Sequence, residues 1–210
     1  MENAIKISRQ VRSHQVKQHI LEAAVELLTK YGYERVTVDN VCETANVSVG
    51  SFYHHFKDKG ELLAYCFAAK YEKYWQKYEN ELGEDFIENI IIICNTYTKF
   101  CMEQGVQFIR NFYTPNNKCL DISDVDLEGE TNLPIGTKVY NELKKANEKG
   151  YLIPAIDISR VVVDMCIIEK GFMFEWALTN GKYDLLQNVQ RIFRHMLDNI
   201  ASEKYKQTFK

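Results

Sequence analysis

The sequence has little of what interrupts helices or anchors a chain in a membrane. Among its 210 residues there are only three prolines, Pro115, Pro134 and Pro154, and no sustained alternation of apolar and polar residues. Strands are therefore not predicted, and an all-α fold is expected. The longest purely apolar run, residues 90–94, is far shorter than the ~20 residues that cross a membrane. Because no apolar segment follows the first charged residues either, we expect a cytoplasmic protein without a membrane partner.

The cysteines form no C-x-x-C pair. They are Cys42, Cys66, Cys94, Cys101, Cys119 and Cys166. Most of them lie in apolar helical patterns, where a thiol behaves as a small hydrophobic group, so reduced cysteines are expected. Cys94 and Cys101 lie two helical turns apart on one face. A redox-sensing pair there is the less favoured alternative, because cytosolic disulfides are rare.

Signatures of catalysis and of metal binding are missing as well. The sequence contains no glycine-rich phosphate loop, no G-x-S-x-G and no H-E-x-x-H motif, and His195 is the only histidine after residue 60. The acidic segment 119–134 lacks the ligand spacing of a calcium loop. We therefore expect no enzyme activity, no cofactor and no metal site. A helical enzyme or small-molecule carrier stays as the alternative.

The charge is distributed unevenly along the chain. The net charge is -3, but residues 1–60 hold eight Lys or Arg against seven Asp or Glu. Four of these basic residues lie in the first eighteen positions: Lys6, Arg9, Arg12 and Lys17. The same segment contains one acidic residue, Glu2. The N-terminal segment is interpreted either as a basic arm on a neutral module or as an ordinary solvated terminus.

The first 60 residues predict three helices. Apolar residues recur at helical spacing from Ser13 to Tyr31, and Gly32 follows as a C-terminal cap. Thr37 is a good N-cap for a short second helix. Asn46 then occupies a tight turn, since asparagine tolerates positive φ better than any residue except glycine. Ser48 can cap the third helix.

The third helix separates two kinds of side chain. Phe52 and Phe56 lie one turn apart and are predicted to face inward, which leaves the residues between them facing outward. Two short helices across a tight turn, after a longer helix, make a helix-turn-helix. Asp58, with Glu61 three residues later, is predicted to cap a fourth helix that ends at Leu82 and is closed by Gly83.

Residues 37–63, TVDNVCETANVSVGSFYHHFKDKGELL, carry a specific resemblance. They closely resemble the DNA-binding signature of the TetR family of transcriptional regulators, roughly T-V-x-x-I-A-x-x-A-G-V-S-x-G-x-L/F-Y-x-H/Y-F-x-x-K-x-x-L. Two positions depart from it. Asn46 replaces the usual turn glycine, and Val49 stands where many members carry Lys or Arg. An apolar residue there favours contact with thymine methyl groups.

The resemblance implies double-stranded DNA as a partner and residues 1–57 as the DNA-binding domain. The DNA-binding set that it implies is Thr37, Ser48, Val49, Gly50, Ser51, Tyr53, His54 and Lys59. Within it, Val49, Ser51 and His54 are candidate base readers. Thr37, Tyr53, His54 and Lys59 are candidate phosphate contacts, Ser48 caps the helix, and Gly50 allows close backbone approach. Tyr53 is also expected to pack partly against the module, and Lys59 read alone is an ordinary surface charge.

Residues 58–210 are predicted to form a helical effector-binding and dimerisation domain. The resemblance implies a homodimer through the last two helices, hence a palindromic operator. The interface set is Val162, Cys166, Met173, Val189, Ile192, Phe193, Met196, Leu197 and Ile200. Burial of both apolar faces within one subunit is the alternative.

Between the DNA-binding module and the last two predicted helices the chain is rich in aromatic and thioether side chains. An unidentified small-molecule effector is implied by the resemblance, with a candidate pocket of Tyr97, Phe100, Phe108, Phe112, Tyr140, Glu169, Met173 and Trp176. Plain core is the alternative for the aromatic residues. Glu169 can recognise a cationic effector, cap an edge of the bundle in water, or pair with Lys170 or Arg194 across a dimer. Control by a protein partner instead of a small molecule also stays open.

Overall fold

The computed structural model describes residues 2–31, 35–113, 117, 120–122 and 134–210. Gly32 and most of the acidic segment 119–134 lie outside these residues. The described chain is all-α, as predicted, and its one β feature is an isolated bridge between Leu152 and Ala201. The helices are α1 (Glu2–Tyr31), α2 (Val38–Ala45), α3 (Val49–His55), α4 (Lys59–Trp75), the 3-10 helix η2 (Glu79–Glu81), α5 (Phe86–Gln104), α6 (Val106–Phe112), α7 (Pro134–Glu148), α8 (Ile158–Leu178), α9 (Leu185–Ile200) and α10 (Glu203–Phe209).

The chain divides into two compact units. Unit 1 comprises Met1–Ala69 with Asn117–Cys119, and unit 2 comprises Lys70–Asn116 with Leu120–Lys210. Helix α4 contributes its first residues to unit 1 and its last residues to unit 2. The predicted domain boundary between residues 57 and 58 stays a prediction.

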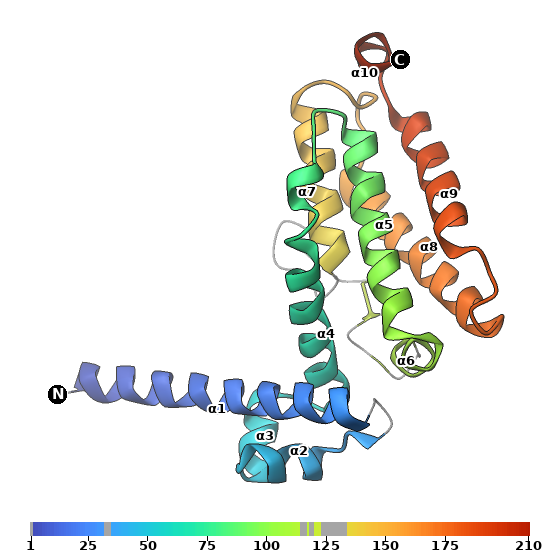
Figure 1. Cartoon of the computed structure of the whole chain (residues 1–210). Helices are drawn as coiled ribbons and strands as arrows, with labels where there is room; N and C mark the ends of the chain where they lie inside the picture. Colours follow the sequence, from blue (N-terminus) through green and yellow to red (C-terminus); the bar gives the residue numbers. More distant parts are fainter. Residues whose placement is uncertain (1, 32–34, 114–116, 118–119, 123–133) are drawn as a thin grey trace. The chain divides into compact units, whose positions relative to one another are not determined.

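Unit 1 is organised around one apolar cluster to which all four of its helices contribute. In Figure 1, α2 and α3 lie together against α1. The buried members of the cluster are Ile20, Ala23, Ala24, Leu27, Val36, Val41, Cys42, Phe52, Phe56, Leu62, Leu63 and Cys66. Side chains from four helices thus share one core, and each short helix is held by tertiary packing rather than by its own propensity.

Two predicted helix ends differ from the structure. Helix α1 begins at Glu2 instead of Ser13. Residues 2–12 contain no glycine or proline, so the helix continues although the apolar periodicity starts only at Val16. Helix α4 ends at Trp75 instead of Leu82, because the buried stripe of α4 stops there and the following backbone forms tight turns and η2.

Unit 2 is a bundle around α5. This helix contacts α7 and α9, while α8 contacts α6, α7 and α9 (Figure 1). Most of the side chains of α5 are buried, as the core of a bundle requires. At one end of the unit, Tyr205 of α10 donates a hydrogen bond of 2.7 Å to Asp85, the N-cap of α5. The C-terminal helix is therefore fixed to the bundle.

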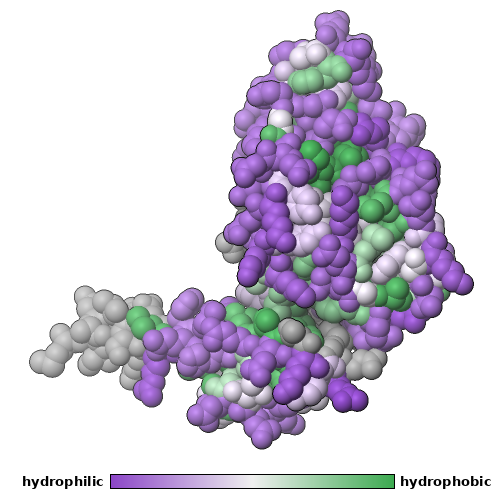
Figure 2. All heavy atoms as spheres, in the orientation of Figure 1, coloured by the Kyte–Doolittle hydropathy of each residue, from purple (hydrophilic) through white to green (hydrophobic). Residues whose placement is uncertain are grey.

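The surface of unit 2 is mixed in polarity. On the face that Figure 2 presents, hydrophobic residues reach the surface as separate patches among hydrophilic ones. Three of the large exposed apolar residues of the unit, Ile167, Phe174 and Leu178, come from α8. None of the helices in the described part of the chain is long and apolar enough to cross a membrane.

We expect Phe52→Ala to lower the free energy of unfolding by about 3–5 kcal/mol, because Phe52 is fully buried and its removal leaves a cavity in the core of unit 1. Urea unfolding followed by circular dichroism measures the change. Val49→Ala is the matched control on the same helix, where the side chain is 44% exposed and a change within about 0.5 kcal/mol is expected. A Phe52→Ala effect no larger than that of the control would contradict the anchoring role.

Candidate functional site

The turn between α2 and α3 has the geometry that the sequence predicts. Thr37 caps α2 reciprocally with Asn40: the Asn40 N–H donates to Thr37 Oγ1 at 3.2 Å, and the Thr37 N–H donates to Asn40 Oδ1 at 2.8 Å. Asn46 adopts the left-handed conformation with φ 53° and ψ 47°. The Val47 N–H then donates to the Cys42 carbonyl at 3.0 Å. These local bonds fix the start of α3 relative to α2.

Helix α3 presents a polar and aromatic face and buries an apolar one. Phe52 and Phe56 are 0% and 1% exposed, as predicted, and their ring centroids are 5.8 Å apart. On the opposite face Val49 and Tyr53, one turn apart, are 44% and 56% exposed. His54 is exposed too. The exposed side chains could therefore reach base edges or phosphates without disturbing the core.

Aromatic contacts hold α3 in place. The Tyr53 ring meets that of its neighbour Phe52 edge-on at a centroid distance of 5.3 Å. Phe56 meets Tyr65 of α4 at 5.7 Å. The ammonium group of Lys17 on α1 lies 4.2 Å from the centroid of the Tyr65 ring. This cation–π contact ties the first helix to the same cluster.

The hydroxyl groups at the starts of α2 and α3 differ in how many hydrogen bonds they can still make. Thr37 Oγ1 accepts the capping bond, so its own hydrogen can still be donated to a phosphate oxygen. Ser48 Oγ accepts from the Ser51 N–H at 3.1 Å and also lies 2.9 Å from Ser51 Oγ. Ser51 is half-buried. The Ser51 hydroxyl is thus within hydrogen-bond distance of the capping Ser48 hydroxyl, and a contact from Ser51 to a DNA base has to compete with that interaction.

The start of α4 carries Lys59, the last member of the proposed DNA-binding set. Asp58 caps α4 by accepting from the Glu61 N–H at 2.9 Å, as predicted. The Glu61 carboxylate accepts in turn from the Lys57 N–H, one residue before the cap. Lys59 is half-buried at the first helical position. As the first residue of α4 it lies at the helix N-terminus, where backbone N–H groups also attract an anion.

The adjacent histidines have different environments. His54 is exposed, whereas His55 is half-buried and its ring lies 5.0 Å from that of His54. Burial lowers the pKa of His55, and the nearby His54 and Lys17 charges lower it further. His55 is therefore neutral near pH 7. In the described residues, no group of three or more His, Cys, Asp or Glu is arranged to hold a metal ion.

The residues proposed for an effector pocket all lie in unit 2. Tyr97 and Phe100 are on α5, Phe108 and Phe112 on α6, Tyr140 on α7, and Glu169, Met173 and Trp176 on α8. Phe108 is half-buried and the others are buried. Phe108 and Phe112 stack at a centroid distance of 5.3 Å, and the Tyr97 hydroxyl lies 2.6 Å from that of Tyr113.

Glu169 is the exceptional residue of this interior. It is 2% exposed, and burial raises the pKa of its carboxyl group to about 8. Its Oε1 lies 3.0 Å from Thr98 Oγ1, which also donates to the Cys94 carbonyl at 2.8 Å. One hydroxyl hydrogen cannot serve both acceptors fully, and a protonated Glu169 relieves this by donating to Thr98. The geometry and the raised pKa both favour a neutral carboxyl group at pH 7.

The cysteines in the described residues are buried and free. Burial raises the pKa of both Cys94 and Cys101, so little reactive thiolate is present at neutral pH. This environment argues against a redox role for the pair.

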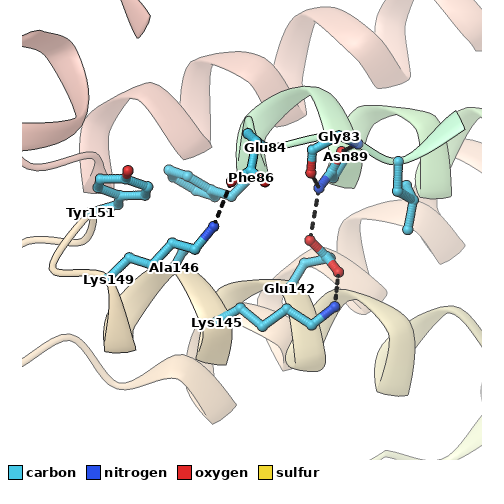
Figure 3. Close-up of a pocket in the computed structure, with 10 residues that line it drawn as sticks. Gly83, Glu84, Phe86, Asn89, Glu142, Lys145, Ala146, Lys149 and Tyr151 are labelled. Carbon is cyan, nitrogen blue, oxygen red and sulfur yellow. Dashed lines mark hydrogen bonds and ion pairs between the residues drawn. The ribbon is translucent and has the colours of Figure 1, made fainter. Parts of the chain in front are cut away.

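Unit 2 also contains an open groove between α5 and α7, with a volume of about 230 Å³ (Figure 3). Its charged side chains already have partners. Lys149 pairs with Glu84 at 2.9 Å and Lys145 with Glu142 at 2.7 Å, and the Asn89 amide donates to Glu142 at 2.9 Å. Since no charge in the groove needs a ligand for neutralisation, we do not assign a site there.

The residues proposed for a dimer interface divide into two groups. Ile192, Met196 and Ile200 on α9 are half-buried. The others are buried within the single chain: Val162, Cys166, Met173, Val189, Phe193 and Leu197. Side chains with so little exposed surface cannot supply the area of contact with a second copy, so these six lie in the core of unit 2.

Sequence reasoning did not select Tyr71, which belongs to the same interior. Its ring meets Tyr97 edge-on at 5.2 Å and packs against Phe100 at 5.4 Å. Its hydroxyl has no hydrogen-bond partner among the described residues. The spacing of Phe67, Tyr71 and Trp75, one turn apart on α4, marks a buried stripe. Nothing in that spacing indicates an unpaired hydroxyl group.

Comparison with known proteins finds a family match for the N-terminal module. Residues 20–66 match the family model for bacterial regulatory proteins, tetR family. The HTH-type transcriptional repressor KstR of Rhodococcus jostii is 32% identical over 83 residues, which are 40% of this chain and 39% of KstR. The HTH-type transcriptional regulator TtgR of Pseudomonas putida is 22% identical over 187 residues, 85% of this chain and 88% of TtgR.

Among solved structures, FadR of Thermus thermophilus, a TetR-family repressor in complex with lauroyl-CoA, has a TM-score of 0.63. The match covers 86% of this chain and 92% of FadR at 18% identity. At that identity the likeness shows the fold and does not transfer the ligand. The sequence match with KstR spans less than half of KstR, while the one with TtgR spans most of both chains.

We expect Glu169 to make the unfolding free energy depend on pH. Its pKa is about 8 in the folded chain, against an ordinary value of 4.5, so between these values the folded chain binds the additional proton. Stability therefore falls as pH rises through this window, by up to about 1.4 kcal/mol per unit, and levels off above pH 8. Urea unfolding at about pH 5.5, 6.5 and 7.5 measures the slope.

Glu169→Gln should remove this component of the slope, since an amide does not titrate. Glu148→Gln, on the exposed face of α7, serves as the control and should leave the slope unchanged. Identical slopes for the unmutated protein and Glu169→Gln would show that Glu169 is ionised in the folded chain.

Proposed function

The chain belongs to the TetR family of transcriptional regulators, and we propose that it is a homodimeric repressor that a small-molecule effector releases from a palindromic operator. The observation that carries the proposal is the exposed face of α3. Val49, Gly50, Tyr53 and His54 form two adjacent exposed stripes, while Phe52 and Phe56 hold the helix on the core. A rigid short helix with exposed side chains of this kind fits the major groove. The relatives named above are transcriptional regulators, and we propose no catalytic role.

The proposed dimer surface is an apolar stripe on α8. Ile167, Phe174 and Leu178 are 52%, 57% and 61% exposed, and their spacing places them on one face of the helix. Gly171 lies on the same stripe, and a Cβ atom built there would meet nothing within 4 Å. Ile192, Met196 and Ile200 on α9, which contacts α8, are half-buried and are proposed to belong to the same interface. Exposed large apolar residues in a contiguous row are typical of a protein interface.

This surface replaces most of the interface predicted from the sequence. Helices α8 and α9 remain the proposed dimerisation elements, but the contact is proposed to be made by the exposed face of α8 rather than by Val162, Cys166 or Met173. A two-fold dimer would present two copies of α3 to half-sites about one DNA turn, ~34 Å, apart or somewhat more.

Regulation is proposed to act as a shift between two populations. An effector that binds preferentially to the form with low operator affinity reduces DNA binding by the coupling free energy, typically about 1–3 kcal/mol. Buried polar atoms of unit 2 that have no partner among the described residues support a ligand site in its interior.

Selection of bound sequences from a random DNA pool at fixed salt tests the function directly. A palindromic site with half-sites about one helical turn apart is the expected result. If a folded dimer selects only single half-sites, or no sequence at all, the dimeric repressor proposal fails.

We expect substitutions on α3 and at the start of α4 to separate affinity from specificity. Tyr53→Phe and Lys59→Ala should weaken binding to all sequences similarly, and Lys59→Ala should reduce the slope of log affinity against log salt by about 1. Val49→Ala and Ser51→Ala should instead change which bases are preferred. Repeating the selection and a salt titration for each variant measures both effects. Equal changes of specificity for all four variants would show that the orientation assigned to α3 is wrong.

Phe174→Asp should convert the dimer to a monomer, because a carboxylate in the apolar stripe would be buried without a partner. Light scattering measures the mass, and affinity for a palindrome should fall while circular dichroism stays unchanged. Asn147→Asp adds the same charge on the exposed face of α7 and should leave a dimer. A Phe174→Asp variant that remains dimeric would exclude the α8 stripe as the interface.

A further inference from the structure

Glu169 is a buried carboxyl group that no cation of the described chain neutralises. Its Oε2 atom has no hydrogen-bond partner among the described residues, and Thr98 is the only side chain that hydrogen-bonds to it there. The neighbouring Lys170 donates to the Leu120 carbonyl at 2.9 Å, and Arg194 pairs with Glu88. Both cations that the sequence suggested as partners are thus engaged elsewhere within the chain.

Aromatic rings and a second unpaired group belong to the same part of unit 2. The Tyr71 side chain is fully buried, its hydroxyl has no partner in the described residues, and its electrostatic environment includes Glu169. Tyr71 packs against Tyr97 and Phe100. Trp176 lies two turns from Glu169 on the buried face of α8, and its indole N–H also has no partner there.

Such a set of buried polar groups is unusual in the core of a folded protein. Buried polar atoms are nearly always hydrogen-bonded, and a carboxyl group in an apolar interior is costly unless a partner compensates for the lost hydration. Tyr71, Glu169 and Trp176 each carry a polar atom that has no partner among the described residues, which indicates that a bound molecule supplies one. A positive charge would neutralise the Glu169 carboxylate, and the faces of Tyr and Trp rings attract cations as well.

We infer that the effector of the proposed repressor is a small aromatic or amphipathic monocation, which binds in unit 2 with its positive charge against Glu169 and the ring of Tyr71. This inference rests on the proposed function and names the chemical class of its ligand. Trp176 offers an indole N–H to an acceptor atom two helical turns away, which is about 10 Å along the axis.

Proton release accompanies binding in this arrangement. The other titratable groups near Glu169 are Tyr71 of α4, Cys94, Tyr97 and Cys101 of α5, Tyr113 after α6, and Cys166 and the cationic Lys170 on α8 itself. Burial raises the pKa of each of these phenols and thiols, so they remain neutral at pH 6–9. Glu169, with a pKa of about 8, is the one that changes charge in this range. A cation favours its ionised form, so affinity for the cation rises with pH and levels off above pH 8.

Three probes of similar shape and different charge test the class: phenyltrimethylammonium, the neutral tert-butylbenzene and the anionic benzenesulfonate. The protein has two tryptophans, and Trp75→Phe leaves Trp176 as the only one, so its fluorescence reports binding within unit 2 without DNA. We expect phenyltrimethylammonium to bind at least about tenfold more tightly than either other probe at pH 8.5. Between pH 8 and pH 6.5 its affinity should fall by about tenfold or more.

Glu169→Gln in the same background should abolish the preference for the cation and its pH dependence, while Glu148→Gln should preserve both. A circular dichroism melt of each variant verifies folding, and the pH dependence in the unmutated site tests the inference even if Glu169→Gln does not fold. Equal binding of cation and neutral probe, tightest binding of benzenesulfonate, or no saturable binding of the cation would overturn the inference.

The outcome is separable from that of the proposed function. DNA selection by the unliganded protein tests the repressor, whereas the fluorescence titration tests the ligand class alone. A protein that selects a palindrome but does not prefer the cation remains a repressor with a different effector class. Binding of phenyltrimethylammonium that leaves the affinity for the selected palindrome unchanged overturns the assignment of the cation as effector.

Discussion

The burial of Phe52 and Phe56 in the core of unit 1 is the contact on which the proposed recognition surface depends. A helix as short as α3 is not stable by itself in water, so its position comes from its neighbours. The two phenylalanines fix its rotation, the Asn46 turn and the Ser48 cap fix its start, and Lys17 holds the adjoining aromatic cluster from α1. The side chains proposed to touch DNA are therefore aimed by residues that do not reach it.

Unit 2 follows the opposite principle around Glu169. Where unit 1 satisfies its polar groups locally, the interior of unit 2 keeps a carboxyl group, a phenol and an indole incompletely paired among the described residues. The raised pKa of Glu169 shows that the protein meets the cost of burial by taking up a proton. Such a group lowers stability unless something binds to it, which is the usual relation between a functional site and the core that surrounds it.

Features set by short-range chemistry could be predicted from the sequence. The Thr37 and Ser48 caps, the left-handed Asn46 and the inward Phe52 each depend on residues within about one turn, and the structure confirms them. The predicted start of α1 and the predicted end of α4 were wrong, because apolar periodicity marks the buried part of a helix rather than its full length. The covered face of α8 could not be predicted, since both of its faces are apolar and only tertiary packing decides between Val162 and Ile167. An unpaired hydroxyl such as that of Tyr71 likewise depends on distant neighbours.

Gly171, in the middle of the exposed α8 stripe, has a consequence for the choice of partner. In the proposed dimer, the absence of a β carbon at Gly171 would let the two α8 backbones approach each other more closely there than elsewhere on the stripe. A chain of the same fold with a larger residue at the equivalent position would have to hold its helix farther away, and Phe174 and Leu178 would lose contact. In a cell that contains several such chains, this glycine would favour pairing of the protein with itself over mixed assemblies.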